Sequence, residues 1–142
     1  MNGMKPYILV IDGQGGSIGL RLVKLLRERL PDAEIMAVGT NSAASVNMLK
    51  SGASAAATGE NAVITACRKA DIITGPVGIA IADALYGEVT PAMAAAVGSS
   101  AAVRVLIPFN RCDTVIAGTE DIPSSRLIDS AAEKITALLS NS

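Results

Sequence analysis

Strand-like and helix-like patterns alternate along the whole chain. Continuous apolar runs rich in β-branched residues predict buried parallel strands, and apolar residues at three- and four-residue spacing predict helices that pack on a sheet. Strands are expected at residues 7–12, 34–38, 71–74, 103–107 and 114–117, with a weaker one at 53–57. Helices are expected at residues 18–30, 43–50, 61–70 and 125–139, with two short ones within 77–100.

The alternation of these elements sets the expected architecture. Strands separated by helices are joined by right-handed crossovers, which make a sheet parallel and cover both of its faces. We therefore expect one α/β domain over residues 1–142, with a doubly wound, mostly parallel sheet of five or six strands. Within the 77–100 stretch, Gly87 separates the two short helices, and Thr90 followed by Pro91 is typical of a helix N-terminus.

Composition narrows the possible chemistry. The chain has only three aromatic residues among its 142, so an aliphatic core is expected. Its net charge of −1 and lack of a polybasic block argue against a nucleic-acid partner. With no histidine and no CxxC pair, since Cys67 and Cys112 lie far apart, neither a metal site nor a disulfide framework is expected.

The sequence also shows no signal for export or membrane insertion. No N-terminal segment has the form of a signal peptide, and no apolar run approaches the roughly 20 residues that span a bilayer. We expect a cytoplasmic protein without a membrane partner. The stretch 77–102 is rich in alanine and glycine, which lets helices approach closely, so a homo-oligomer is expected.

A glycine-rich turn follows the first strand and leads directly into the first helix. Glycine permits sharp turns and close approach of a ligand to the backbone, and a helix N-terminus offers unpaired N–H groups. Together these features predict an anion site of the kind that binds nucleotide phosphates. The expected binding residues in this turn are Gly13, Gly15, Gly16, Ser17 and Ile18.

The turn resembles the phosphate loop of Rossmann-type NAD(P)- and nucleotide-binding proteins. Gly13 and Gly15 match the start of G-x-G-x-x-G, although Ile18 stands at the third glycine position. Aligned on the short-chain dehydrogenase loop, Gly13, Ile18 and Gly19 match. Thr90 stands where that family has the lysine of Y-x-x-x-K after Tyr86, which argues against membership. The resemblance implies that the loop backbone contacts phosphate. Size and pattern are also similar to short bacterial domain-of-unknown-function proteins.

The strand ends around the loop refine the expected ligand. Asp12 is expected to cap loop N–H groups rather than to bind Mg²⁺. Where NAD-binding folds place a carboxylate after the second strand, this chain has Thr40, Asn41 and Ser42, so NADP fits better than NAD. An adenine nucleotide, a sugar phosphate or a coenzyme A fragment fits as well. Gly75, at another strand end, and Arg111, as a phosphate clamp, complete the expected site.

No catalytic residue is assigned, and whether the protein is an enzyme stays open. Glu88 would act as a general base only with a raised pKa, and Cys112 as a nucleophile only with a lowered one. The favoured hypothesis is a sensing or regulatory nucleotide-binding module for a phosphate-bearing small molecule. The first alternative is an NADP-dependent reductase or another small enzyme completed by oligomerisation. The second is a partner-binding subunit in which the glycine loop is only a turn.

Overall fold

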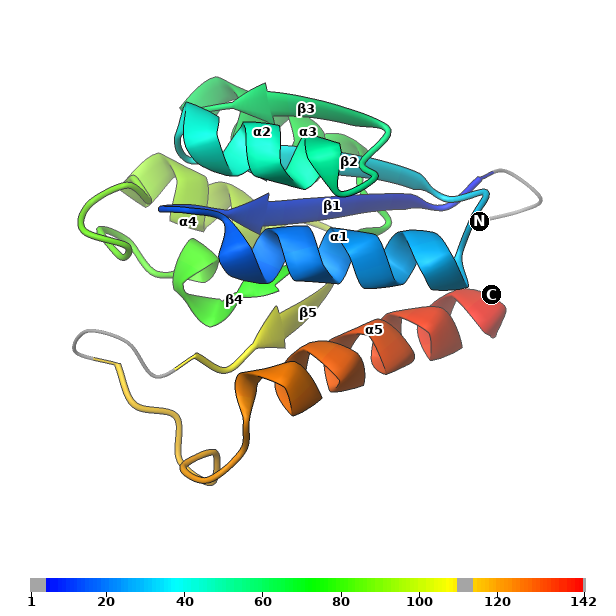
Figure 1. Ribbon diagram of the computed structural model, residues 1–142. Coiled ribbons are helices and arrows are strands. Elements are labelled where there is room, and N and C mark those ends of the chain that lie inside the picture. Colours follow the sequence, from blue (N-terminus) through cyan, green and yellow to red (C-terminus); the bar gives the residue numbers. More distant parts are fainter. Residues whose placement is uncertain (1–4, 110–113, 142) are drawn as a thin grey trace.

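The computed structural model describes residues 5–109 and 114–141 and contains a five-stranded parallel sheet (Figure 1). The strand order is β3-β2-β1-β4-β5, and every neighbouring pair is parallel. This confirms the expected doubly wound α/β architecture with five strands. The strands are β1 Tyr7–Asp12, β2 Glu34–Gly39, β3 Ala55–Thr58, β4 Ile72–Pro76 and β5 Val103–Ile107.

Helices cover both faces of the sheet, and each face has its own apolar cluster. One face packs against α1, α2 and α5, and the other against α3, α4 and the short 3₁₀ helix η1 (Figure 1). The two-sided burial explains why the central strands are continuously apolar. The helices are α1 Ser17–Arg29, α2 Ser42–Lys50, α3 Glu60–Lys69, η1 Val77–Ala80, α4 Pro91–Ser99 and α5 Ser124–Ser140.

The central strand β1 shows how the sequence pattern becomes two cores. Successive side chains of a strand point to opposite faces. Ile8 and Val10 belong to the cluster under α1, α2 and α5, whereas Leu9 and Ile11 belong to the cluster under α3 and α4. All four are at most 1% exposed, so β1 is the centre of the fold.

Most element boundaries fall within one or two residues of the expected ones, with two corrections. The strand expected at 114–117 is wrong: these residues are irregular, and the Val115 side chain is 74% exposed. An apolar strand needs a sheet partner that covers it, and this segment has none among the described residues. The first helix expected within 77–100 is only η1, followed by turns. The expected start of α4 is confirmed, because the Thr90 hydroxyl accepts the N–H of Met93 at 3.1 Å.

The order of the strands creates a switch point between β1 and β4. The chain runs outward from β1 to β2 and β3, then returns to lay β4 on the opposite side of β1. Connections on the two sides of β1 diverge there, which opens a crevice at the carboxyl ends of the strands. No helix among the described residues is long and apolar enough to cross a membrane.

Candidate functional site

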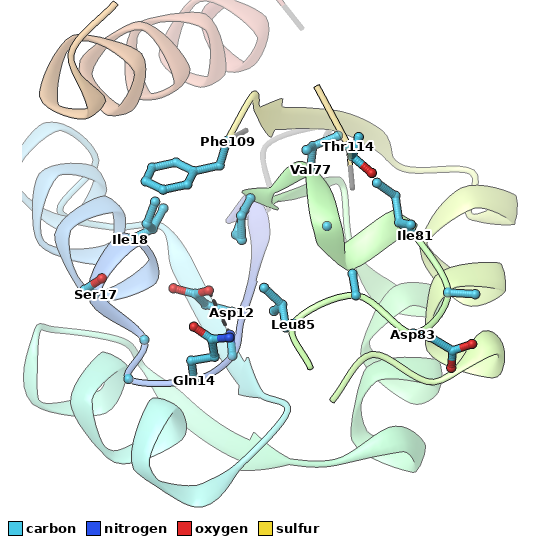
Figure 2. Close-up of a pocket in the computed structure, with 17 residues that line it drawn as sticks. Asp12, Gln14, Ser17, Ile18, Val77, Ile81, Asp83, Leu85, Phe109 and Thr114 are labelled. Atoms are coloured by element: carbon cyan, nitrogen blue, oxygen red, sulfur yellow. Dashed lines mark hydrogen bonds between the residues drawn. The ribbon is translucent and has the colours of Figure 1, made fainter. Parts of the chain in front are cut away.

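A cavity of about 330 Å³ lies at this switch point, between the β1–α1 loop and the chain that follows β4 (Figure 2). One wall consists of residues 12–18, which end β1 and begin α1. The facing wall comes from residues 76–78 and 81–85, and Phe109 and Thr114 contribute from beyond β5. The expected residues Gly13, Gly15, Gly16, Ser17 and Ile18 all line the cavity.

The β1–α1 loop is held from within by the Asp12 carboxylate. Its two oxygens accept the N–H groups of Gly13 and Gly19, each at 2.7 Å. Asp12 is only 5% exposed, so these bonds form in a mostly dry environment and are correspondingly strong. The prediction that Asp12 caps the loop is confirmed.

The shape of the loop comes from a tight turn at its centre. The N–H of Gly16 donates to the Gly13 carbonyl at 2.8 Å, and Gly16 is left-handed, with φ of 70°. A side chain at Gly16 would be strained, and its Cβ would lie 2.9 Å from the Ala44 backbone. Gly16 is therefore a packing requirement of the fold, whatever the cavity binds.

Three backbone donors of the loop remain available to the cavity. Within residues 5–109 and 114–141, the N–H groups of Gly15, Ser17 and Ile18 have no hydrogen-bond acceptor. All three residues line the cavity, and Ser17 also brings its hydroxyl. Ser17 and Ile18 begin the 13-residue helix α1, and Gly15 directly precedes its N-cap Gly16, so the partial positive charge of the helix dipole lies at this end. This wall of the cavity can accept an anion.

The opposite wall is mostly apolar. Figure 2 shows Phe109 extending toward Ile18, and Leu85 directed into the cavity from the segment after η1. Val77 and Ile81 add aliphatic surface. The cavity thus joins hydrogen-bond donors on one side to an apolar surface on the other, which suits a ligand with an anionic group and a flat or apolar body.

The segment that carries Leu85 has an unusual backbone. Asp83, Leu85 and Tyr86 have φ of 65°, 57° and 56°, a conformation that side chains rarely adopt. Backbone bonds close the base of the segment, from Asp83 N–H to the Val89 carbonyl and from Val89 N–H to the Ala84 carbonyl. Such strain persists only where the surroundings hold it in place, and it is common at binding sites.

Glu88 ends this segment and connects it to two other loops. One carboxylate oxygen, Oε1, accepts the Gln14 N–H at 2.7 Å, the Thr40 hydroxyl at 2.6 Å and the Asn41 amide at 2.9 Å. Burial raises the pKa of Glu88, but these three hydrogen bonds outweigh it, and the pKa lies below its ordinary value. A general-base role for Glu88 is conditional on a raised pKa, and Glu88 does not meet that condition.

The residues expected to hold a ribose or 2′-phosphate have internal partners instead. Thr40 and Asn41 both donate to Glu88, and the side-chain oxygen Oδ1 of Asn41 caps α2 by accepting the Ala44 N–H at 2.9 Å. Ser42 is the first residue of α2. None of these three lines the cavity among its described residues. Sequence reasoning missed the role of Glu88 here, because no local signal shows that a residue 48 positions away reaches the end of β2.

The remaining candidates fall away from the cavity or outside the described residues. Gly75 lies within β4, and a Cβ at this position would overlap the Ile11 carbonyl oxygen of β1. The lack of a side chain at Gly75 therefore lets β1 and β4 lie close together. Arg111 and Cys112 lie outside the described residues. Cys67 belongs to the buried core, and burial raises its thiol pKa to about 11, which disfavours the reactive thiolate. Within residues 5–109 and 114–141, no group of His, Cys, Asp or Glu is placed to hold a metal ion.

Fold and site together define a doubly wound α/β protein with a loop-lined cavity at its switch point. The sequence matches the family model described as "Domain of unknown function (DUF3842)" over residues 7–140, and the chain belongs to this family. The expected similarity to domain-of-unknown-function proteins is thereby confirmed. No curated protein matches the sequence. Among solved structures, the chain is similar to a dodecameric FMN-dependent Ubix-like decarboxylase from Escherichia coli O157:H7. The two are 20% identical over 94% of this chain and 76% of that one, with a TM-score of 0.45.

Proposed function

We propose that this protein is a small nucleotide-binding module that senses a mononucleotide-sized, phosphate-bearing ligand in the switch-point cavity. The observation that carries the proposal is the set of three available N–H groups, of Gly15, Ser17 and Ile18, facing an apolar wall across one cavity. The phosphate would accept hydrogen bonds from these groups and from the Ser17 hydroxyl. The base would lie against Phe109 and Leu85.

Gly15 gives independent support for a ligand at the loop. At Gly13, Gly16 and Gly19 an added Cβ would lie within 3 Å of other atoms, so packing alone requires glycine there. At Gly15 a Cβ would meet nothing within 4 Å, and the backbone is not left-handed. Internal structure therefore gives no reason for glycine at this position. Close approach of a phosphate to the backbone supplies one.

The size and chemistry of the cavity favour a mononucleotide and a binding role. A volume of about 330 Å³ is at the small end of ligand pockets. Among the described lining residues, only Asp12 and Asp83 are titratable, and both Asp12 oxygens already accept backbone N–H groups. An acid–base pair is therefore not assembled in this part of the wall. Of the ligands expected from the sequence, an adenine nucleotide fits this geometry better than NADP.

A binding screen tests the proposal directly. Purified protein is examined by thermal shift and calorimetry with AMP, ATP, NAD, NADP and coenzyme A, with inorganic phosphate as a control. Ligand binding to the native state raises the unfolding midpoint by mass action. We expect AMP or ATP to raise it. If no nucleotide shifts the midpoint, the proposal is wrong.

Matched substitutions at Gly15 locate the site. Gly15→Asp adds a carboxylate beside the phosphate, whereas Gly15→Asn adds nearly the same volume without charge. We expect Gly15→Asp to weaken AMP binding by at least about tenfold, equal to about 1.4 kcal/mol, and Gly15→Asn to weaken it less. Gly98→Ala is the control, because Gly98 in α4 also has open space around its Cβ position. Equal AMP affinity in Gly15→Asp and in the unchanged protein would exclude the loop.

A further inference from the structure

We propose that Glu88 is a specificity-determining residue: its carboxylate occupies the place at the end of β2 where a dinucleotide's ribose would bind, so the site excludes NAD and NADP. This inference rests on the proposed function, because it concerns which nucleotides the cavity admits. On open α/β sheets, dinucleotides cross the switch point, and the end of β2 contacts the adenosine ribose. The groups that would make those contacts here are already bonded to Glu88.

The donors themselves are present and suitably placed. The Thr40 hydroxyl, the Asn41 amide and the Gln14 N–H converge on the single oxygen Oε1 of Glu88, at 2.6, 2.9 and 2.7 Å. Three neutral donors around one point can hold a phosphate or a pair of ribose hydroxyls. Glu88 therefore acts as an internal substitute for that part of a ligand.

Steric cover reinforces the exclusion. A Cβ on Gly13 would overlap Thr40 Oγ1 and would lie 2.8 Å from both Glu88 Oε1 and Leu85 Cδ1. On the side of Gly13 that faces Thr40 and Glu88 there is thus no room even for a methyl group. A dinucleotide that runs from the β2 side to the β4 side must cross this point, whereas a mononucleotide confined to the cavity does not.

Charge acts in the same direction. The hydrogen bonds to Glu88 favour its ionised form, so the end of β2 carries a negative charge. A 2′-phosphate brought to the end of β2 would meet a carboxylate in place of the arginine that usually accommodates NADP. Like charges at such short range disfavour binding.

The test compares AMP and NADP affinities, measured by calorimetry, in the unchanged protein and in Glu88→Ala. We expect the unchanged protein to bind NADP at least about tenfold more weakly than AMP, and Glu88→Ala to improve NADP binding at least about tenfold. Glu60→Ala is the matched control, because the Glu60 carboxylate also bonds the end of this segment, at the Thr90 hydroxyl, but away from the cavity. It should leave the ratio of the two affinities unchanged.

Glu88→Gln provides a second variant in case Glu88→Ala does not fold, because it keeps the side-chain volume and removes the charge. It should shift the ratio in the same direction, by less. Unaltered NADP affinity in both variants overturns the inference, as does equal binding of AMP and NADP to the unchanged protein. The proposed function fails separately, if AMP and the other mononucleotides do not bind the unchanged protein at all.

Discussion

The carboxylate of Asp12, the last residue of β1, accepts the N–H of Gly19 in the first turn of α1 at 2.7 Å. The other oxygen of the same carboxylate accepts the Gly13 N–H, so one buried side chain holds both ends of the loop. The residues that carry the loop's remaining donors, Gly15, Ser17 and Ile18, line the cavity. The conformation of this wall of the cavity therefore depends on the Asp12 carboxylate.

Asp12→Asn should therefore destabilise the fold. An asparagine has one carbonyl oxygen and an NH₂ group, so one of the two loop N–H groups would face a donor. We expect a loss of about 1–3 kcal/mol, the cost of leaving a buried polar group without its partner. Urea denaturation measures it, with Asp32→Asn as control, because Asp32 is exposed. Equal losses in the two variants would contradict this role of Asp12.

Thr74→Val should leave stability unchanged or increase it. Thr74 lies in β4 with 0% exposure, and its hydroxyl has no hydrogen-bond partner among the described residues. Valine keeps the shape and removes the desolvated hydroxyl, which favours the fold by about 1 kcal/mol. Thr136→Val is the control, since the Thr136 hydroxyl donates to the Ala132 carbonyl at 2.8 Å. A clear loss of stability in Thr74→Val, measured by urea denaturation, would show that the Thr74 hydroxyl stabilises the fold and would contradict this prediction.

Gly13→Ala should be more destabilising than Gly15→Ala. The new Cβ at position 13 would press on Thr40, Leu85 and Glu88, whereas at position 15 it would enter open space. Overpacking of this kind costs about 1–3 kcal/mol. Thermal and urea unfolding of the two variants give the comparison. Equal stabilities of Gly13→Ala and Gly15→Ala would mean that the segment with Leu85 and Glu88 shifts to accommodate the new methyl group without loss of stability.

The contribution of Glu88 to stability should be lost in acid. Its hydrogen bonds hold the pKa of Glu88 in the folded protein below the ordinary value of 4.5, so the folded state favours the ionised carboxylate. A lowered folded-state pKa adds stability above the unfolded-state pKa, and this stability disappears as the pH falls through the folded-state pKa. The difference in thermal unfolding midpoint between the unchanged protein and Glu88→Gln should be greatest near neutral pH and should shrink below pH 4.5. A difference that grows in acid would contradict this.

Cys67 should resist thiol reagents while the protein is folded. Its side chain is 4% exposed, and with a pKa of about 11 only about a thousandth of the thiol is ionised at pH 8. A Cys112→Ser variant isolates this residue. Maleimide labelling followed by mass spectrometry should show slow reaction in buffer and rapid reaction in urea. Rapid labelling of the native variant would show that the helix α3 opens readily.

The order of elements was predictable because its signals are local. The continuous apolar run of β1 predicts a strand buried on both faces, and the helical stripe of α5 predicts a helix buried on one side. Both patterns can be recognised without knowing the partners of each element. The strand expected at 114–117 shows the limit of this reasoning. A short apolar run predicts a strand only if a sheet edge covers it, and the structure puts Val115 in solvent.

The sequence by itself determined the alternation of strands and helices, the glycine loop after β1 and the cap by Asp12, because periodicity and contacts between near neighbours along the chain carry them. Only the tertiary structure decided that Glu88 reaches the end of β2, where Thr40 and Asn41 become its donors. Residues 48 and 47 positions apart meet there because the segment after η1 turns back over the loop. No periodicity or motif encodes such a contact, since it depends on how separate elements pack.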